Sequence, residues 1–282
     1  MGQILDGKEV AASVKDEVAE AVAKLDYRPG LATVLVGDDP ASHTYVRGKR
    51  RDAEQVGINS IHNELPDSVG QEELLSLIRS LNENDDVDGI LVQLPLPDDL
   101  DGEGAVEAID PAKDVDGLHP FNLGLLALGR PGLRPCTPSG VIRILDHYGI
   151  QTAGAKVTIV GRSFLVGRPL AMILSERGVD STVTMAHSRT KGLTAVTREA
   201  DILVAAAGSP GLIGADHVNP GATVIDVGIN RTDEGLVGDV DFDAVADIAG
   251  AITPVPGGVG PMTRAMLLVN TLRAARARRA AA

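Results

Sequence analysis

Hydrophobic residues in this chain recur at two spacings, which predict alternating helices and strands. Apolar positions three or four residues apart, as over residues 7–25, are typical of amphipathic helices. Short, nearly continuous apolar runs, as over 31–36, are typical of buried strands. In the first part of the chain we expect helices at 7–25, 41–56 and 71–81, strands at 31–36, 59–65 and 89–94, and a short helix after Gly104.

The same alternation resumes after a Pro-rich segment. We predict no regular element over residues 110–138 and place a domain boundary there. Alternating strands and helices indicate a parallel sheet with helical crossovers, so the predicted fold class is α/β. Beyond the boundary we expect a helix at 139–148, strands at 156–160, 182–186, 202–206 and 223–227, a helix beginning near Pro169, and a final helix from Pro261 to about Arg279.

Charge and composition narrow the range of functions. The 282 residues are enough for one large or two small domains, and the formal net charge is −13. A negative surface repels phosphate backbones, and 2% aromatic residues with no Trp leave little for bases to stack on. Nucleic acid is therefore not an expected partner.

Two features bear on location and redox chemistry. No uninterrupted apolar run reaches about 18 residues, and residues 1–8 lack a basic stretch followed by an apolar one. We therefore expect no membrane association, no secretory signal and a cytoplasmic location. The single cysteine, Cys136, excludes an internal disulfide and a cysteine-clustered metal site; we expect it to be a small core residue and expect no metal.

The turn after the strand at 156–160 has the context of a dinucleotide-binding loop. The strand runs into Gly161, Arg162 and Ser163, and a helix begins near Pro169, so backbone N–H groups there could hold a pyrophosphate. The spacing is G-x-S-x-x-x-G rather than G-x-G-x-x-G, so an ordinary strand–helix turn is the alternative.

The end of the next strand bears on which dinucleotide is bound. NAD-specific folds usually carry an acid about 20 residues beyond the glycines, for the ribose 2′-hydroxyl. Here the strand at 182–186 runs into hydroxyls and cations at 187–191, including Ser188 and Arg189. Together with Arg162, they suit a 2′-phosphate and predict NADP.

Three polar residues could form a reaction centre. Tyr45 and Lys49 are four residues apart on a predicted helix and share one face, although such pairs are more often surface contacts. Gln93 ends an apolar strand, where parallel sheets present groups to ligands, and could hydrogen-bond a functional side chain. A water-facing glutamine at the strand edge is the alternative.

Two later loops are further candidates. Asp114 and Asp116 could each bind a cationic or amide-like donor, although solvated loop acids are commoner and the pair does not make a metal site. Residues 253–263 combine stiff prolines with glycines that permit close backbone approach. That combination suits a flat ligand, with a plain loop as the alternative.

Taken in order, these segments resemble the bifunctional methylenetetrahydrofolate dehydrogenase/methenyltetrahydrofolate cyclohydrolases, the FolD family. The resemblance covers essentially the full chain, and the joint order of the motifs is more specific than any one of them. The matching segments are Tyr45-Val46 with Lys49, GILVQLPLP from Gly89, KDVDG from Lys113, PCTPSG from Pro135, GRSFLVGRP from Gly161, DVGIN from Asp226 and TPVPGGVGPMT from Thr253.

The resemblance implies a fold and a reaction. It implies two α/β domains flanking a cleft: a folate-binding catalytic domain at 1–120, completed by the helix at 261–282, and a Rossmann-type NADP-binding domain at 138–260. NADP⁺ would oxidise 5,10-methylenetetrahydrofolate to the methenyl compound, and water would open that to 10-formyltetrahydrofolate. The family resemblance also implies a homodimer.

It also implies residue roles on the folate side. Lys49 is the catalytic residue that assists the attack of water, Gln93 hydrogen-bonds to it, and Tyr45 packs against the folate ring system. Asp116 binds the pterin edge, with Asp114 a less suitable substitute. The folate site is further lined by Pro256, Gly257 and Gly258.

On the cofactor side, Gly161, Arg162 and Ser163 match the pyrophosphate and 2′-phosphate loop. Ser188 matches the adenosine-phosphate contact, and Ile229 matches a backbone contact to the nicotinamide half. Arg168 and Arg189 add positive charge beside this loop, with contact to phosphate or to solvent left open.

Two alternatives stay open. One is a monofunctional NADP-dependent dehydrogenase, acting on methylenetetrahydrofolate or on another small metabolite. The other is a non-catalytic NADP-sensing protein of the same fold. The combination of Tyr45, Lys49, Gln93 and Asp116 argues against a sensor, which has no chemical need of it.

Overall fold

The computed structural model describes residues 2–233 and 235–281. Its contacts divide the chain into two compact units. One, here called the six-stranded unit, comprises the residues up to Ala11 and Thr137–Thr263; the other, the three-stranded unit, comprises Ala12–Cys136 and the residues from Arg264. The assignment of folate binding to residues 1–120 with 261–282, and of NADP binding to 138–260, stays a prediction. Residues 1 and 282, at the ends of these ranges, lie outside the described part of the chain.

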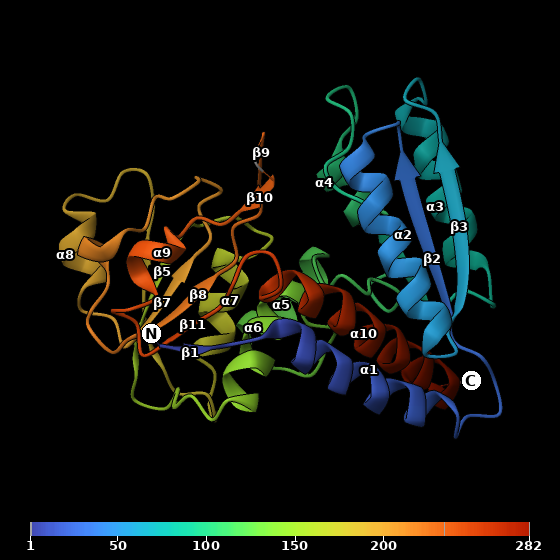
Figure 1. The fold of residues 1–282 in the computed structure, drawn as a ribbon. Helices are drawn as coiled ribbons and strands as arrows, with labels where there is room; N and C mark the ends of the chain where they lie inside the picture. The colour runs from blue at the N-terminus through green and yellow to red at the C-terminus, as the bar shows by residue number, and fades with distance from the viewer. Residues whose placement is uncertain (1, 234, 282) are drawn as a thin grey trace. The chain divides into compact units, whose positions relative to one another are not determined.

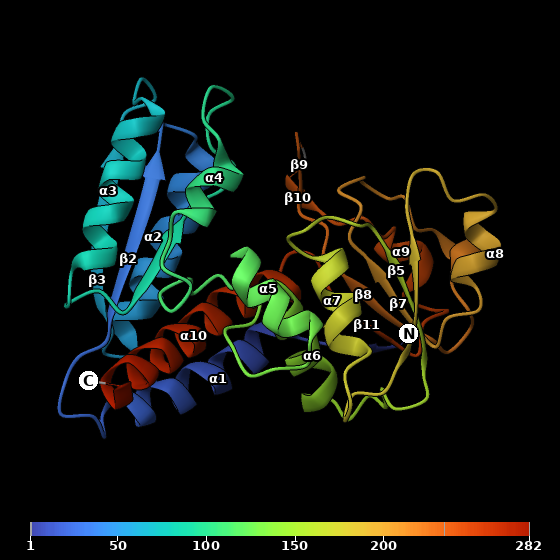
Figure 2. The same cartoon turned by 180° about the vertical axis from the view of Figure 1, so that it is seen from behind.

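A parallel sheet forms the centre of the three-stranded unit. Its strand order is β3-β2-β4, formed by β2 (Gly30–Val36), β3 (Asn59–Leu65) and β4 (Gly89–Val92). Every residue of the central strand β2 is buried, as its apolar sequence predicts. Helices α2 (Pro40–Gln55) and α3 (Gln71–Glu83) lie on opposite faces of this sheet (Figures 1 and 2).

Local sequence signals explain where α2 begins. The carboxylate of Asp39 accepts a hydrogen bond from the backbone N–H of Ser42, and Pro40 occupies the first turn. The α3 side chains Leu74 and Ile78 are fully buried in the core beside strand residues of the sheet. Helices α1 (Gly7–Val22) and α10 (Val259–Ala281) each extend from the six-stranded into the three-stranded unit.

The prediction of irregular structure over 110–138 is wrong. The segment contains α5 (Pro120–Ala127), and α6 (Cys136–His147) begins within it. Pro120 occupies the first turn of α5, and the His119 ring accepts a hydrogen bond from the backbone N–H of Phe121. Pro120 therefore starts a helix, whereas the Pro-rich composition of the segment predicted irregular structure. A short helix, α4 (Gly102–Glu107), precedes this segment.

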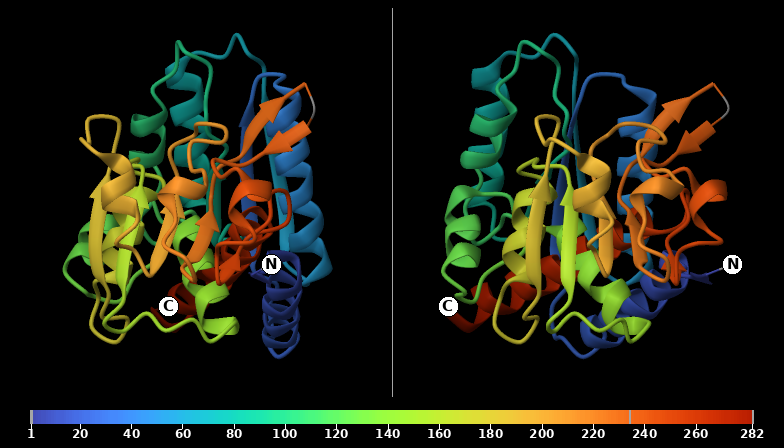
Figure 3. Two further views of the ribbon diagram at one scale, coloured as in Figure 1. Left: turned by 60° about the vertical axis from the view of Figure 1, so that its left-hand side comes forward. Right: turned by 90° about the vertical axis from the view of Figure 1, so that its left-hand side faces the viewer.

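The six-stranded unit is built on a parallel sheet with the order β1-β11-β8-β7-β5-β6. Helices α7 (Gly167–Leu174) and α9 (Phe242–Val245) lie on opposite faces of it (Figures 1 and 2). Figure 3 shows the same sheet from two further directions. The strands are β1 (Gln3–Ile4), β5 (Lys156–Val160), β6 (Thr182–Ala186), β7 (Ile202–Ala205), β8 (Thr223–Asp226) and β11 (Ala251–Ile252).

Every strand predicted from the sequence is present, as β2 to β8, and the α/β class is confirmed. Several other short elements were not predicted, because they show neither an apolar run nor a helical periodicity. They include β1 and β11, α8 (Leu193–Thr197), α9, the 3₁₀ turn Ala215–His217, and an antiparallel hairpin of β9 (Asn230–Thr232) and β10 (Gly235–Val237). Among the described residues, no helix combines the length and apolar character that crossing a bilayer requires.

Candidate active site

Helix α2 presents Tyr45 and Lys49 on one face, as their spacing predicts. The Lys49 Nζ lies 4.6 Å from the centroid of the Tyr45 ring, within the range of a cation–π contact. Lys49 is only 5% exposed, so this is not the surface pair that the sequence left open. A buried lysine needs a partner for its amine.

Gln93 is that partner. It follows the last residue of β4, and its backbone N–H still donates to the Val34 carbonyl at 2.9 Å. The Leu94 carbonyl can only accept, so the Gln93 amide nitrogen, 2.6 Å away, must face it. The amide oxygen Oε1 is thereby fixed towards Lys49 and accepts from its Nζ at 3.0 Å. The hydrogen bond implied by the resemblance is confirmed, and a water-facing glutamine is wrong.

The surroundings of Lys49 favour its neutral amine. Burial lowers the pKa of Lys49, and the charge of Arg264 lowers it further, whereas Asp116 raises it. Cys136 also lies close, but burial raises the pKa of its thiol well above the usual value, so this group is uncharged. Asp116 and Arg264 are therefore the charged neighbours that set the protonation of Lys49.

The two loop acids have different roles. Asp114 is 1% exposed, and its carboxylate accepts from the backbone N–H groups of Gly117 and His119 and from the Asn122 amide, at 2.8 to 3.1 Å. The interpretation of Asp114 as a solvated loop acid is wrong, because these bonds use it to shape the loop. Asp116 is half-buried, and burial raises its pKa while the charge of Lys49 lowers it.

Sequence reasoning missed the residues that hold the Asp116 segment. Asn270 on α10 donates from Nδ2 to the carbonyls of Val115 and Arg134 at 2.9 and 2.8 Å. Cys136 is buried, as expected, and its Sγ donates to the Val115 carbonyl at 3.2 Å. An amide among apolar helix residues is a local signal that Asn270 needs hydrogen-bond partners. Those partners are more than 130 positions away in the sequence, so the sequence does not identify them.

The loop after β5 is a tight turn that only glycine permits. Gly161 has φ +135°, and a Cβ there would lie 2.0 Å from the Ala206 carbonyl oxygen. A Cβ on Gly167 would lie 2.2 Å from the Gly161 carbonyl oxygen. Arg162 and Ser163 are exposed, and α7 begins without a side-chain cap at Val166. This arrangement fits a bound pyrophosphate, because helix N-termini supply N–H donors to anions.

The turn after β6 leaves its cations accessible. The Thr190 hydroxyl accepts from the His187 backbone N–H at 2.9 Å, and the His187 ring accepts from that of Arg189 at 3.1 Å. Ser188 and Arg189 are exposed. Since β5 and β6 pair in parallel, this turn and the one carrying Arg162 follow neighbouring strand ends. Their donor set fits a 2′-phosphate.

Two buried carboxylates tie down the loops after β7 and β8. Asp239 is fully buried and accepts from the backbone N–H groups of residues 207–209 and from the Asn230 amide, at 2.6 to 2.8 Å. Asp226 accepts from the N–H groups of Gly228, Asp239 and Val240. Burial raises the pKa of Asp226 to about 6. Ile229, 55% exposed, lies beside these anchors.

The segment around Pro256 packs closely against its own chain. Gly257 has φ +119°, and the Gly258 N–H donates to the Pro254 carbonyl at 2.8 Å. A Cβ on Gly7 would lie 1.7 Å from the Gly258 carbonyl oxygen. The expectation that the glycines of this segment let its backbone approach a flat ligand stays a prediction. These residues belong to the six-stranded unit, and Tyr45, Lys49, Gln93 and Asp116 to the three-stranded one.

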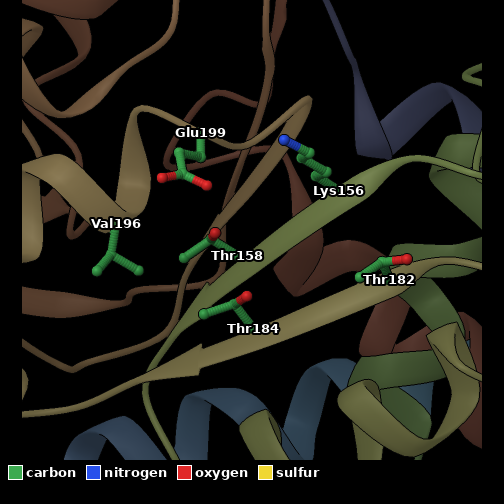
Figure 4. A pocket seen from close by; sticks show the side chains of 6 residues that line it. All are labelled: Lys156, Thr158, Thr182, Thr184, Val196 and Glu199. Atoms are coloured by element: carbon green, nitrogen blue, oxygen red, sulfur yellow. The ribbon is translucent and has the colours of Figure 1, made fainter.

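A pocket elsewhere in the six-stranded unit does not belong to this site. Figure 4 shows its lining from β5, β6 and the region of α8, with Lys156 and Thr182 at the first positions of their strands. The glycine turn after β5 lies at the opposite end of these strands. The remaining residues that line the pocket are Thr158, Thr184, Val196 and Glu199.

One group of side chains has spacing that a metal ion could use. Ligand atoms of Asp38, His43 and Glu64 lie within 4.8 Å of one another. Asp38 and Glu64 are exposed, and their carboxylates lie 3.9 and 3.4 Å from the Nε2 atoms of His43 and His62. The sequence did not predict this group, and it is separate from the residues around Lys49.

Comparison with known proteins places the chain in a family. The catalytic-domain model of tetrahydrofolate dehydrogenase/cyclohydrolase matches residues 5–116, and the NAD(P)-binding-domain model of the same family matches residues 135–279. Bifunctional protein FolD 2 of Frankia alni is 58% identical over 278 residues, covering 97% of this chain and 96% of that protein.

Solved structures agree with this placement. The bifunctional FolD enzyme of Campylobacter jejuni superimposes with a TM-score of 0.95 at 47% identity, covering 99% of this chain and 100% of that one. The Trypanosoma brucei enzyme, solved with NADP cofactor and an inhibitor, gives a TM-score of 0.94 at 41% identity, covering 100% and 99%. The chain belongs to the tetrahydrofolate dehydrogenase/cyclohydrolase family.

Proposed function

We propose that this protein oxidises 5,10-methylenetetrahydrofolate with NADP⁺ and hydrolyses the methenyl product to 10-formyltetrahydrofolate. Its family membership supports both activities. The observation that carries the hydrolytic step is the buried Lys49, whose pKa is lowered and whose amine is held by Gln93 at 3.0 Å. The alternative, a monofunctional dehydrogenase, requires only the oxidation and not the hydrolysis.

Lys49 acts as the base for water. A neutral amine that donates one proton to Gln93 Oε1 keeps its lone pair free to accept a proton from an attacking water. The oxygen bonds to the methenyl carbon. The bond from that carbon to N5 then breaks, N5 takes up the proton of the new hydroxyl group, and 10-formyltetrahydrofolate is released. Gln93 orients the amine, because its own amide is fixed by the Leu94 carbonyl.

Asp116 and Tyr45 bind the folate in this proposal. Asp116 accepts hydrogen bonds from the pterin edge, and the Tyr45 ring packs against the ring system. Asp114 is unsuited to the same task, since two backbone donors in its own loop and the Asn122 amide on α5 already use its carboxylate. Pro256, Gly257 and Gly258 contribute the remaining folate contacts that the family resemblance implies.

The NADP site uses the turns after β5, β6 and β8. Gly161, Arg162 and Ser163 hold the pyrophosphate and 2′-phosphate, Ser188 contacts the adenosine phosphate, and the backbone of Ile229 contacts the nicotinamide half. When bound, NADP⁺ accepts the hydride from the one-carbon bridge. The domain ranges predicted from the sequence follow: folate binding by 1–120 with the helix at 261–282, and NADP binding by 138–260.

The quaternary structure proposed from the family resemblance is a homodimer. Light scattering of the purified chain measures its mass directly. A mass near twice 29.3 kDa supports the dimer, and a mass near 29.3 kDa at the concentration used for assay contradicts it.

Absorbance with both substrates tests the reaction. Purified protein is mixed with 5,10-methylenetetrahydrofolate and NADP⁺, with NAD⁺ in parallel, while reduced cofactor and methenyl product are followed together. We expect reduced NADP with only transient methenyl signal. Methenyl product that accumulates and decays only at the uncatalysed rate contradicts the hydrolase. Equal or better turnover with saturating NAD⁺ contradicts the preference for NADP.

A further inference from the structure

We propose that Arg264 is a positioning residue for the hydrolytic step, because its guanidinium packs on α2 at Gly48 and pairs with Asp52, the residues on either side of Lys49 along that helix. The proposal rests on the role of Lys49 given above. Arg264 lies near the start of α10, about 215 positions from Lys49 in the sequence, and carries no motif of its own. Three observations within the three-stranded unit support it.

The first is an ion-pair network that fixes the guanidinium. Arg264 Nε lies 3.3 Å from Asp52 Oδ2, and Lys15 Nζ lies 3.5 Å from Asp52 Oδ1. The Asp52 side chain is 2% exposed and that of Arg264 25% exposed. Since Asp52 follows Lys49 by three residues on α2, it occupies a neighbouring position on the helix surface. The carboxylate therefore holds Arg264 beside the turn that carries Lys49.

The second observation is the space at Gly48. A Cβ on this buried glycine would lie 2.4 Å from Arg264 Nη1, and the next nearest atoms also belong to Arg264. The guanidinium thus packs directly against the α2 backbone at the residue before Lys49. Glycine in a helix interior is unfavourable relative to alanine, and the close approach of Arg264 explains why it occurs here.

The third is the balance of charges that face Lys49. Tyr45 on the same helix and Asp116 in its loop favour the protonated amine, Gln93 on the β4 exit is neutral, and the Cys136 thiol is uncharged. Burial and Arg264 both lower the pKa of Lys49. Arg264 is the cation in this set, and because a guanidinium stays charged throughout the working pH range, its effect is constant.

A lysine base works only when its amine is neutral, so the hydrolysis rate should fall as the pH drops below the pKa of Lys49. We call this part of the pH–rate profile the acidic limb, and the charge of Arg264 influences the pH at which it lies. Removal of this like charge should raise the pKa of Lys49. At a pH on the acidic limb, the neutral fraction of Lys49 and the hydrolysis rate should then both fall. Hydride transfer does not use the amine as a base and should not shift in the same way.

The test measures the pH dependence of methenyltetrahydrofolate hydrolysis, corrected for the uncatalysed rate, in purified full-length variants. Arg264→Gln should move the acidic limb to higher pH, and Arg264→Lys, which keeps a cation, should largely restore it. Gly48→Ala should move the limb in the same direction, because the new methyl group displaces the guanidinium while alanine favours the helix.

Arg278→Gln is the matched control. Arg278 lies on the same helix, its side chain is 23% exposed, and it pairs with the buried Asp88 at 2.7 Å. Its removal takes the same charge from α10 but should leave the limb in place. If Arg264→Gln does not fold, as judged by circular dichroism, Gly48→Ala alone decides the question.

An acidic limb that is unchanged in folded Arg264→Gln and in Gly48→Ala overturns the proposal. An equal shift in Arg278→Gln also overturns it, because the effect would then be general. The role of Lys49 is tested separately. If Lys49→Gln retains enzymatic hydrolysis, the proposed function of Lys49 is wrong; if hydrolysis is lost there but the Arg264 variants do not shift, only the present proposal fails.

Discussion

At the scale of single residues, two acids of the same loop differ in the groups that they contact. Asp114 and Asp116 are two positions apart in KDVDG, yet one accepts three hydrogen bonds within its loop and the other lies beside Lys49. The sequence left both open as acceptors for a cationic or amide-like donor on a ligand. The bonding pattern assigns Asp114 to structure and leaves Asp116 as the acid that we propose binds the substrate.

Replacing each acid by Asn should separate these roles. Asp114→Asn turns an amide N–H₂ towards backbone donors and should lower the free energy of unfolding by about 1–3 kcal/mol. Asp116→Asn should raise the KM for the folate substrate by about tenfold or more, by losing a charged acceptor. Denaturant unfolding and steady-state kinetics measure the two effects.

The stability effect of Asp116→Asn has a defined sign. The pKa of Asp116 is higher in the folded than in the unfolded chain, so ionisation increasingly disfavours the folded state as the pH rises above the unfolded value. Asn cannot ionise, and the variant should therefore be at least as stable as the parent at neutral pH. A large loss of stability in Asp116→Asn, with none in Asp114→Asn, would reverse the assignment.

At the scale of elements, the carboxyl ends of the strands in the six-stranded unit are held by side chains rather than by further sheet. Asp239, from the segment after β10, binds the loop at 207–209 and Asn230. The carboxylate of Asp226, at the end of β8, accepts from the backbone N–H groups of Asp239 and Val240. These bonds set the backbone beside Ile229, which the NADP proposal uses.

Asp239→Asn should therefore act on the cofactor and spare hydrolysis. An amide N–H₂ cannot accept from the donors that now face one carboxylate oxygen, so we expect the KM for NADP⁺ to rise by about tenfold. Hydrolysis of added methenyltetrahydrofolate, measured without cofactor, is the internal reference and should stay close to the parent rate.

Asp241→Asn is the control for this variant. Asp241 is exposed and caps α9 through the Ala244 N–H, a task that Asn performs equally well. It should change neither activity. Equal losses of dehydrogenase and hydrolase in Asp239→Asn would show general damage to the fold and contradict a role confined to the cofactor loops.

At the scale of the whole molecule, the sequence predicted the parts whose signals are local. Strands β2, β4, β5, β7 and β8 are short, mostly apolar runs, and Tyr45 and Lys49 are one helical turn apart, so these features follow from short-range patterns. Strands β1 and β11 have two residues each and exist only because they pair with each other and with β8. No window of sequence contains that information.

The candidate site shows the same limit. Gln93 was predictable from its place at a strand end, whereas Arg264 and Asn270 come from the last helix and meet the Lys49 region only through the fold. Asp52 is buried although it directly follows a run of basic residues in the sequence. Side chains that tune a reactive group from distant elements leave little local signal, since any polar residue could occupy their positions.

The central claim is that one chain carries both activities and that Lys49 serves the hydrolytic one. The most direct measurement follows reduced NADP and methenyltetrahydrofolate together in Lys49→Gln, with Lys24→Gln, an exposed lysine, as the control. The account predicts that Lys49→Gln still reduces some NADP⁺ while methenyl product accumulates and decays at the uncatalysed rate. Hydrolysis at the parent rate in Lys49→Gln, or loss of NADP⁺ binding, would contradict it.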